Sequence, residues 1–377
     1  MRIDGGIGGG PAVLVERLND VIGLRESLAQ AESKNHFAVG EVSEDVASGP
    51  FPGGRIAGER GGEARSVRGQ LRRGMSDDFS WIAIAEEFRV RIGHKSHCIV
   101  GNMDTSKVSE HYGTAELPGR VTQALARFGM GEQTISWQAL ELLDQFHVRA
   151  LPATRELAEA LELKATDHVL DVGSGLGGPA RCVAAEHGCR VTGIDLNERY
   201  VEVARMLTDR TGLSERVQFE QADALRLPFP DATFDHVMTI HVAMNIRDRA
   251  GLFDSIHRVL KGGGRLAIYD VVTGNGEALT FPLPWAREAE TSFLTTPEAM
   301  RDALVAAGFA DVKLSDKTNP GLAAMAAQQA AMQSSPETPR LGLPLVMGQG
   351  FMGMVGNLGR DLQTGKARLY EVLARKA

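Results

Sequence analysis

The chain has 377 residues, 43% hydrophobic and 24% charged, which excludes collagen-like, mucin-like, coiled-coil and wholly disordered proteins. Its 41 Lys and Arg against 48 Asp and Glu give a formal net charge of -7, so the balance disfavours a nucleic-acid partner. The three cysteines, Cys98, Cys182 and Cys189, are too few and too scattered for a disulfide framework or a zinc site, and they fit a reducing cytoplasm.

Residues 1–102 differ in composition from the rest of the chain. Residues 1–76 hold 15 of the 43 glycines and no Trp or Tyr, so they offer little apolar surface to offset the entropy of ordering. No targeting signal and no apolar run long enough for a membrane span is evident. We therefore expect a soluble cytoplasmic protein with a low-order N-terminal extension over 1–102 and a functional unit over 103–377.

The functional unit begins with helical periodicity and then changes period. Apolar residues recur at three- and four-residue spacing through 117–163, which predicts a helical preface over 103–163. Short runs rich in Val and Ile then alternate with helical stretches. The runs predict strands over 168–173, 190–196, 217–223, 234–240, 265–272, 310–318 and 367–376.

Strands that alternate with helices predict right-handed βαβ units and hence an α/β fold with a doubly wound, mostly parallel sheet. The interval 319–366 between the last two strands is too long for a simple connection, and we expect a helical insertion there.

A glycine-rich loop follows the first predicted strand in the run DVGSGLGGPAR. Glycines at this place let the backbone turn sharply and let a ligand approach closely, and the following helix N-terminus favours an anionic group. Gly173, Gly175 and Gly178 also satisfy the GxGxxG fingerprint of dinucleotide-binding enzymes. The loop alone therefore leaves two cofactor classes open.

Acidic residues at the ends of the next strands narrow the choice. Asp195 closes the second predicted strand, where a carboxylate can accept hydrogen bonds from both ribose hydroxyls of an adenosine. Asp223 ends the third strand, where it can hold an exocyclic adenine amine. Asp171 precedes the first glycine by two residues, at a place where a dinucleotide enzyme usually has an apolar residue.

The series VLDVGSGLGG, TGIDL, QADALRLPFPDATFDHV and RVLKGGGRLAIYDVV resembles the motifs of class I S-adenosylmethionine-dependent methyltransferases. The small-molecule branch is the most similar, with its ubiquinone/menaquinone, sterol and sarcosine/dimethylglycine methyltransferases. The resemblance covers about 103–318. It implies a Rossmann-like sheet of seven strands with an antiparallel last strand.

The resemblance also implies a division of the unit and a set of cofactor contacts. It implies a helical lid (103–163), a cofactor-binding core (164–318), the insertion (319–366) and the last strand (367–377). S-adenosylmethionine would then lie against residues of the strand ends and the loops after them, namely Asp171, Gly173, Ser174, Gly175, Gly177, Asp195, Leu196, Asp223 and Ala224.

Three residues are candidates for catalysis. His241 follows the fourth strand at the sheet edge where the acceptor would lie, and a histidine there can remove a proton or simply pack against the cofactor. His147 and Tyr112, in the helical preface, are weaker candidates whose alternative role is packing. The other histidines show no ligand spacing, so no metal is assigned.

The sequence predicts transfer of a methyl group from S-adenosylmethionine to a small organic acceptor at N, O or C. Five of the thirteen methionines lie in the insertion, and if they face the acceptor, it has an apolar part. Two alternatives stay open: an NAD-dependent oxidoreductase on the same loop, and a non-catalytic S-adenosylmethionine-binding module. The oligomeric state is not predicted.

Overall fold

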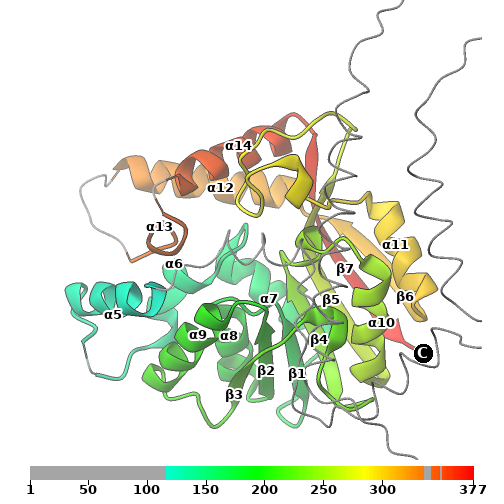
Figure 1. Cartoon of the computed structure of the whole chain (residues 1–377), viewed down its shortest axis with the longest axis horizontal. Helices are drawn as coiled ribbons and strands as arrows, with labels where there is room; N and C mark the ends of the chain where they lie inside the picture. Colours follow the sequence, from blue (N-terminus) through cyan, green and yellow to red (C-terminus); the bar gives the residue numbers. More distant parts are fainter. Residues whose placement is uncertain (1–115, 132, 335–340, 349) are drawn as a thin grey trace, which may run out of the picture. The chain divides into compact units, whose positions relative to one another are not determined.

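The computed structural model describes residues 116–131, 133–334, 341–348 and 350–377 (Figure 1). The predictions for residues 1–102 and for Tyr112 lie outside this part of the chain.

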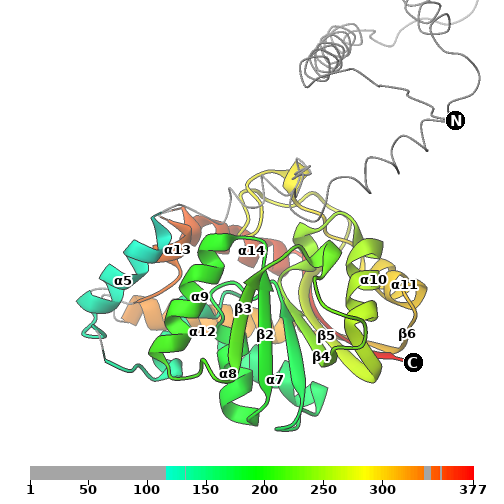
Figure 2. The ribbon, with the colours of Figure 1, turned by 60° about the horizontal axis from the view of Figure 1, so that its bottom comes forward.

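A seven-stranded sheet in the order β3-β2-β1-β4-β5-β7-β6 forms the centre of the fold (Figure 2). β1 to β5 are parallel to one another, while β7 runs antiparallel to both β5 and β6. The predicted doubly wound sheet with an antiparallel last strand is therefore confirmed. The strands are β1 (His168–Val172), β2 (Arg190–Asp195), β3 (Val217–Gln221), β4 (Phe234–Ile240), β5 (Leu260–Thr273), β6 (Phe309–Asp316) and β7 (Ala367–Lys376).

One boundary differs from the sequence prediction. The strand predicted over 265–272 begins earlier, because β5 already starts at Leu260 in the run LKGGGR. Leu260 pairs with Phe234 of β4, and the register then shifts before His236 pairs with Arg265. The glycines therefore lie in a bulged start of the strand, where the absence of side chains permits the irregular backbone.

Helices cover both faces of the sheet, as a doubly wound fold requires (Figure 1). Apolar side chains of α7, α8 and α9 pack on one face, and those of α10 and α11 pack on the other. These helices are α7 (Ala150–Leu161), α8 (Gly178–His187), α9 (Glu198–Arg210), α10 (Arg249–Val259) and α11 (Pro297–Ala306). Their ends follow sequence signals: the Asn197 side chain caps α9, and α8 ends at Gly188 with φ +74°.

The helical preface and the insertion contact each other, and the insertion also packs against β7. The preface consists of α5 (Leu117–Arg127), the 3-10 helix η1 (Trp137–Leu140) and α6 (Glu141–Asp144), followed by α7. The insertion consists of α12 (Thr318–Ser334), α13 (Pro344–Met347) and α14 (Phe351–Gln363). α12 and α14 lie side by side against β7, while α13 contacts α5 (Figure 1).

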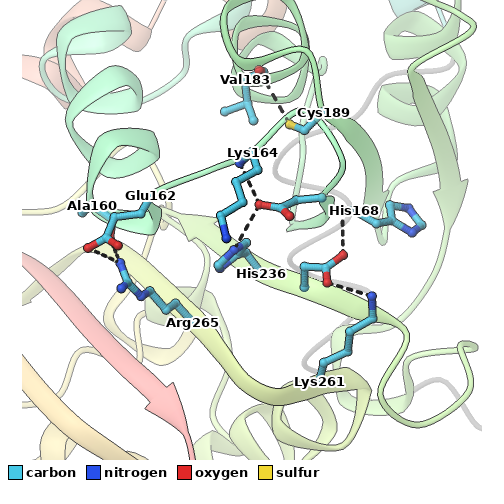
Figure 3. Close-up of polar contacts among 11 residues, drawn as sticks. Ala160, Glu162, Lys164, His168, Val183, Cys189, His236, Lys261 and Arg265 are labelled. Carbon is cyan, nitrogen blue, oxygen red and sulfur yellow. Dashed lines mark hydrogen bonds and ion pairs between the residues drawn. The ribbon is translucent and has the colours of Figure 1, made fainter.

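The amino ends of the strands are held by polar contacts (Figure 3). Asp235 accepts hydrogen bonds from the backbone N–H of His168 and from Lys261 Nζ, at 2.9 and 2.7 Å. Asp167 Oδ2 lies 3.4 Å from His236 Nε2. These histidines therefore take structural roles at the edge of the sheet opposite the glycine-rich loop.

No helix in the described part of the chain is both long and apolar enough to cross a membrane.

Candidate active site

A cavity of about 460 Å³ opens at the carboxyl ends of β1 to β4. Its walls come from the loops after these strands, from the segment between α6 and α7, and from the loop after β5. Nearly all the site residues predicted from the sequence line it: His147, Asp171, Gly173, Ser174, Gly175, Asp195, Leu196, Asp223, Ala224 and His241. The topology thus brings together residues that are 94 positions apart in the chain, from 147 to 241.

Among the predicted residues that the structure describes, Gly177 is the exception, because it does not line the cavity. Its φ is +82°, and a Cβ atom there would lie 2.4 Å from the Phe219 ring. Gly177 therefore permits close packing of the start of α8 on β3.

The first two glycines of the loop line the cavity in backbone conformations that other residues rarely adopt. Gly173 has φ +74°, and a Cβ atom there would lie 2.3 Å from Val242. Gly175 has φ +54°, and a Cβ atom there would meet no atom within 4 Å. Gly173 thus serves the fold, while Gly175 presents its bare backbone to the cavity.

Asp195 is tied to the loop by its carboxylate. Oδ2 accepts from the backbone N–H of Gly175 at 3.0 Å, and Oδ1 accepts from that of Asn197 at 2.9 Å. Burial raises the pKa of Asp195 to about 6, while the backbone hydrogen bonds act in the opposite direction. The carboxylate is therefore ionised and rigidly oriented at neutral pH.

Asp171 is the most unusual group in the cavity wall. Its side chain is 1% exposed, and within the described residues Oδ2 has no hydrogen-bond partner. Burial, with the charge of Asp195 added to it, raises the pKa of Asp171 to about 8. A buried carboxylate with a free oxygen in a cavity wall fits a cationic group on the ligand.

Asp223 marks the end of β3 and caps the short 3-10 helix η2 (Ala224–Arg226), because its Oδ1 accepts from the backbone N–H of Leu225 at 2.9 Å. Asp223 and Ala224 line the cavity on the side of Asp195.

His241 lies in the wall beyond β4 with a strained backbone, at φ 55°. Its ring stacks on Tyr269 at 5.5 Å between centroids, and its backbone N–H donates to the Tyr269 carbonyl at 2.8 Å. Removal from water, together with the positive potential of His147, lowers the pKa of His241 to about 3. Nε2 is buried and has no hydrogen-bond partner among the described residues.

His147 lies against His241 in an edge-to-face arrangement, with 6.1 Å between the ring centroids. Its Nε2 lies 2.8 Å from the carbonyl oxygen of Ala150 and 3.1 Å from Thr154 Oγ1. Burial lowers the pKa of His147 to about 4, so both imidazoles are neutral at pH 7.

A buried ion pair that was not predicted from the sequence lies beneath the glycine loop. Arg181, 0% exposed, donates through NH2 to Asp144 Oδ2 at 2.8 Å and to the Leu176 carbonyl at 2.6 Å. Burial raises the pKa of Asp144 to about 6 and lowers that of Arg181. The pair ties the helical preface to the loop, and the only sequence signal for it was an arginine three residues after the last glycine in GGPAR.

The insertion contributes less to the cavity than its methionines suggested. None of its described residues lines the cavity. Met354 is 5% exposed, whereas Met352 is 45% exposed. The insertion reaches the wall indirectly, since the ring of Phe351 lies 5.8 Å from that of Phe146, a lining residue.

Metal ligands do not gather at the cavity: in the part of the chain that the structure describes, no group of three or more His, Cys, Asp or Glu side chains could hold a metal ion.

Comparison with known proteins agrees with this geometry. Residues 170–268 match the family model described as a methyltransferase domain. The chain is similar to methyltransferase GfsG of Streptomyces halstedii, with 41% identity over 119 residues, or 32% of this chain and 43% of that protein. It is also similar to the 27-O-demethylrifamycin SV methyltransferase of Amycolatopsis mediterranei, with 39% identity over 36% of this chain and 48% of the relative. The match thus spans less than half of the length of either relative.

A solved structure extends the likeness over most of the unit. The cyclase SpnF is 25% identical, with a TM-score of 0.52, over 72% of this chain and 96% of its own. These findings confirm the resemblance that the sequence motifs indicated, and they agree with the predicted fold.

Proposed function

We propose that the chain is an S-adenosylmethionine-dependent methyltransferase that acts on a small organic acceptor. The observation that supports this most directly is the free carboxylate oxygen of Asp171 beside the glycine loop. In a dinucleotide enzyme this loop faces a pyrophosphate, which the charge of Asp195, and that of Asp171 when it is ionised, would repel. A ligand with a cationic sulfonium and ammonium is attracted by the same charges.

The sheet order supports the same choice. A dinucleotide-binding sheet runs 3-2-1-4-5-6, whereas here the antiparallel β7 lies between β5 and β6. NAD-dependent oxidation is therefore the less favoured alternative.

The residues present fit the proposed cofactor. Asp171 would face its methionine portion, Asp195 would accept from the ribose hydroxyls, and Asp223 with Ala224 would flank the adenine. When bound, S-adenosylmethionine supplies a methyl group already activated by its sulfonium. The chain then has to bind both partners, align them and exclude water, which is positioning that contributes roughly 7–11 kcal/mol in favourable cases.

The acceptor is expected to be partly apolar. The cavity is also lined by the apolar residues Phe146, Met244, Ile246, Pro284 and Trp285, and the Trp285 side chain is fixed by donation from Nε1 to Ser292 Oγ at 3.0 Å. The similarity to a rifamycin methyltransferase is consistent with an acceptor of this kind.

The domain division predicted from the sequence remains part of this proposal. The preface over 103–163 would act as a lid, because Asp144, Phe146 and His147 come from it and line the cavity. The buried thiols of Cys182 and Cys189 are free, which suits the reducing cytoplasm that we propose as the compartment.

Incubation of the full chain with isotopically labelled S-adenosylmethionine and fractionated metabolite extracts tests the proposal. We expect label in a low-molecular-weight product, with no transfer in Asp171→Asn protein. Binding of the cofactor without transfer to any fraction would instead favour the non-catalytic binding module.

A further inference from the structure

A strained turn holds the ring of His147. Arg149 and Ala150 have φ values of 72° and 45°, which residues other than glycine seldom adopt. The backbone N–H of Ala150 donates to the His147 carbonyl at 3.1 Å, and Nε2 of the His147 ring lies 2.8 Å from the Ala150 carbonyl oxygen. Two such residues in succession are costly, and strain of this kind gathers at functional sites.

This turn fixes which ring nitrogen carries the proton. A carbonyl oxygen can only accept, so the 2.8 Å contact requires a hydrogen on Nε2 of His147. In a neutral ring, Nδ1 then holds the lone pair. The low pKa of His147 keeps the ring neutral at pH 7.

A second contact supports the same tautomer. The Thr154 hydroxyl donates to Gln145 Oε1 at 2.7 Å, so its oxygen is free to accept from Nε2 of His147 at 3.1 Å. Thr154 is 1% exposed, which leaves it no solvent partner. Thr154 is therefore a positioning residue for the ring, acting from the first half of α7.

His147 lines the cavity. Its Nδ1 is not among the fully buried side-chain nitrogen and oxygen atoms that have no hydrogen-bond partner within the described residues. Among the groups that face the ring, His241 comes from the loop after β4, Tyr269 from β5 and Arg149 from the turn itself. The positive charge of Arg149 disfavours an ammonium at this place. A hydroxyl oxygen, by contrast, is a weak nucleophile until a base removes its proton. The lone pair on Nδ1 of His147 can serve as that base.

We propose that His147 is the proton acceptor for an acidic hydroxyl, phenolic or enolic, on the methyl acceptor. This rests on the proposed methyltransferase function. As the acceptor oxygen forms its bond to the methyl carbon, the carbon–sulfur bond breaks and its electron pair stays on sulfur. The hydroxyl proton passes to Nδ1, so the His147 ring becomes an imidazolium and the acceptor becomes a neutral methyl ether. A phenolic or enolic hydroxyl gives up its proton more readily than an aliphatic alcohol, so among hydroxyls it is the kind that a base of low pKa serves best.

The first test measures the tautomer in the ligand-free full chain. Nitrogen-15 NMR of histidine-labelled protein at pH 7, assigned with His147→Gln, should show Nε2 of His147 protonated and Nδ1 bare. A bare Nε2 would overturn the proposal, and because no cofactor is present, this outcome does not depend on the proposed function.

The second test separates positioning from packing. Thr154→Val keeps the shape but loses the hydroxyl, and it should lower the ratio of the Nε2–H to the Nδ1–H form about fivefold. Thr154→Ser should restore the ratio. Thr239→Val is the matched control, since Thr239 is also 1% exposed and its hydroxyl has no partner among the described residues. An unchanged ratio in Thr154→Val, or an equal change in the control, would contradict the assignment.

The third test uses phenol as the probe, with toluene as the isostere that lacks the hydroxyl. In the complex of the full chain with S-adenosylhomocysteine, phenol should shift the Nδ1 signal of His147, and toluene should not. Equal shifts, or none with phenol up to its solubility, would overturn the hydroxyl assignment. Failure of S-adenosylhomocysteine to bind would instead count against the proposed function.

Discussion

The carboxyl groups of Asp171 and Asp195 lie in the wall of one cavity, and the charge of Asp195 adds to burial in raising the pKa of Asp171 to about 8. Asp195 has backbone donors on both oxygens, whereas Oδ2 of Asp171 has no partner in the described part of the chain. A positive charge on a ligand would therefore favour the ionised form of Asp171.

Cofactor affinity is predicted to depend on pH through Asp171. A cation binds the ionised carboxylate, and below pH 8 an increasing fraction of Asp171 is protonated in the free protein. The dissociation constant of S-adenosylmethionine should thus fall between pH 6 and pH 7, by about fivefold to tenfold. Calorimetry at several pH values measures this. A flat profile in wild type, or the same slope in Asp171→Asn, would show that Asp171 is not the titrating group.

The same carboxylate is predicted to destabilise the ligand-free fold. The folded-state pKa of about 8 lies above the ordinary value of 3.8, so the contribution of Asp171 to stability is lost progressively as the pH rises from about 4 to about 8. Asp171→Asn should therefore raise the Tm of the ligand-free protein at pH 8 by at least about 2 °C, with little change near pH 4. Thermal denaturation at both pH values checks this, and a lower Tm for the variant at pH 8 would contradict it.

Asp195→Ala is predicted to weaken S-adenosylmethionine by one to two decades. The variant leaves the ribose hydroxyls and the Gly175 backbone N–H without their acceptor. Each charge-assisted hydrogen bond contributes ~1.5–3 kcal/mol. Equilibrium binding by the folded variant measures the loss. Affinity within twofold of wild type would place the ribose elsewhere.

Substitution of the two cavity-lining glycines, Gly173 and Gly175, should affect stability in one case and cofactor affinity in the other. Gly173→Ala places a Cβ atom 2.3 Å from Val242 and should lower the Tm clearly. Gly175→Ala meets no atom within 4 Å, so it should cost only the ~1–2 kcal/mol of its positive φ. Its methyl group enters the space proposed for the cofactor, and affinity should fall at least tenfold. Paired Tm and binding measurements test this contrast, which fails if Gly175→Ala binds normally.

Removal of one member of the Asp144–Arg181 pair is predicted to lower the free energy of unfolding more than removal of both charges. Arg181→Met leaves a buried carboxylate uncompensated and should lower the free energy of unfolding by about 3–5 kcal/mol. Adding Asp144→Asn should recover at least half of that loss. Urea denaturation of the two variants measures both values, and additive losses would show that the two side chains do not act as a pair.

The parts of the fold with strong local signals were predictable from sequence. β7 was predicted over its full range, Ala367–Lys376, from a short run that contains the apolar residues Leu369, Tyr370, Val372 and Leu373. The glycine loop and Asp195 were predictable because strand ends and turns leave local marks. The bulged start of β5 was not, since a run of glycines signals a turn and a bulge equally well.

The interior contacts of the site depend on tertiary structure that local patterns do not encode. Asp144 and Arg181 are 37 residues apart in sequence, and Asp144 lies in an ordinary helical pattern. The turn at Arg149 and Ala150 contains no glycine, so its positive φ values left no sequence signal. His241 drew attention by its place after a strand, whereas the hydrogen bonds that fix His147 become visible only in the folded chain.

The central claim is that this cavity binds S-adenosylmethionine in preference to a dinucleotide. Isothermal titration of the full chain at pH 7.5 with S-adenosylmethionine, and separately with NAD, tests it most directly. We predict saturable binding of S-adenosylmethionine that Asp195→Ala weakens at least tenfold, with no detectable heat from NAD. Saturable binding of NAD, or no binding of S-adenosylmethionine, would contradict the account.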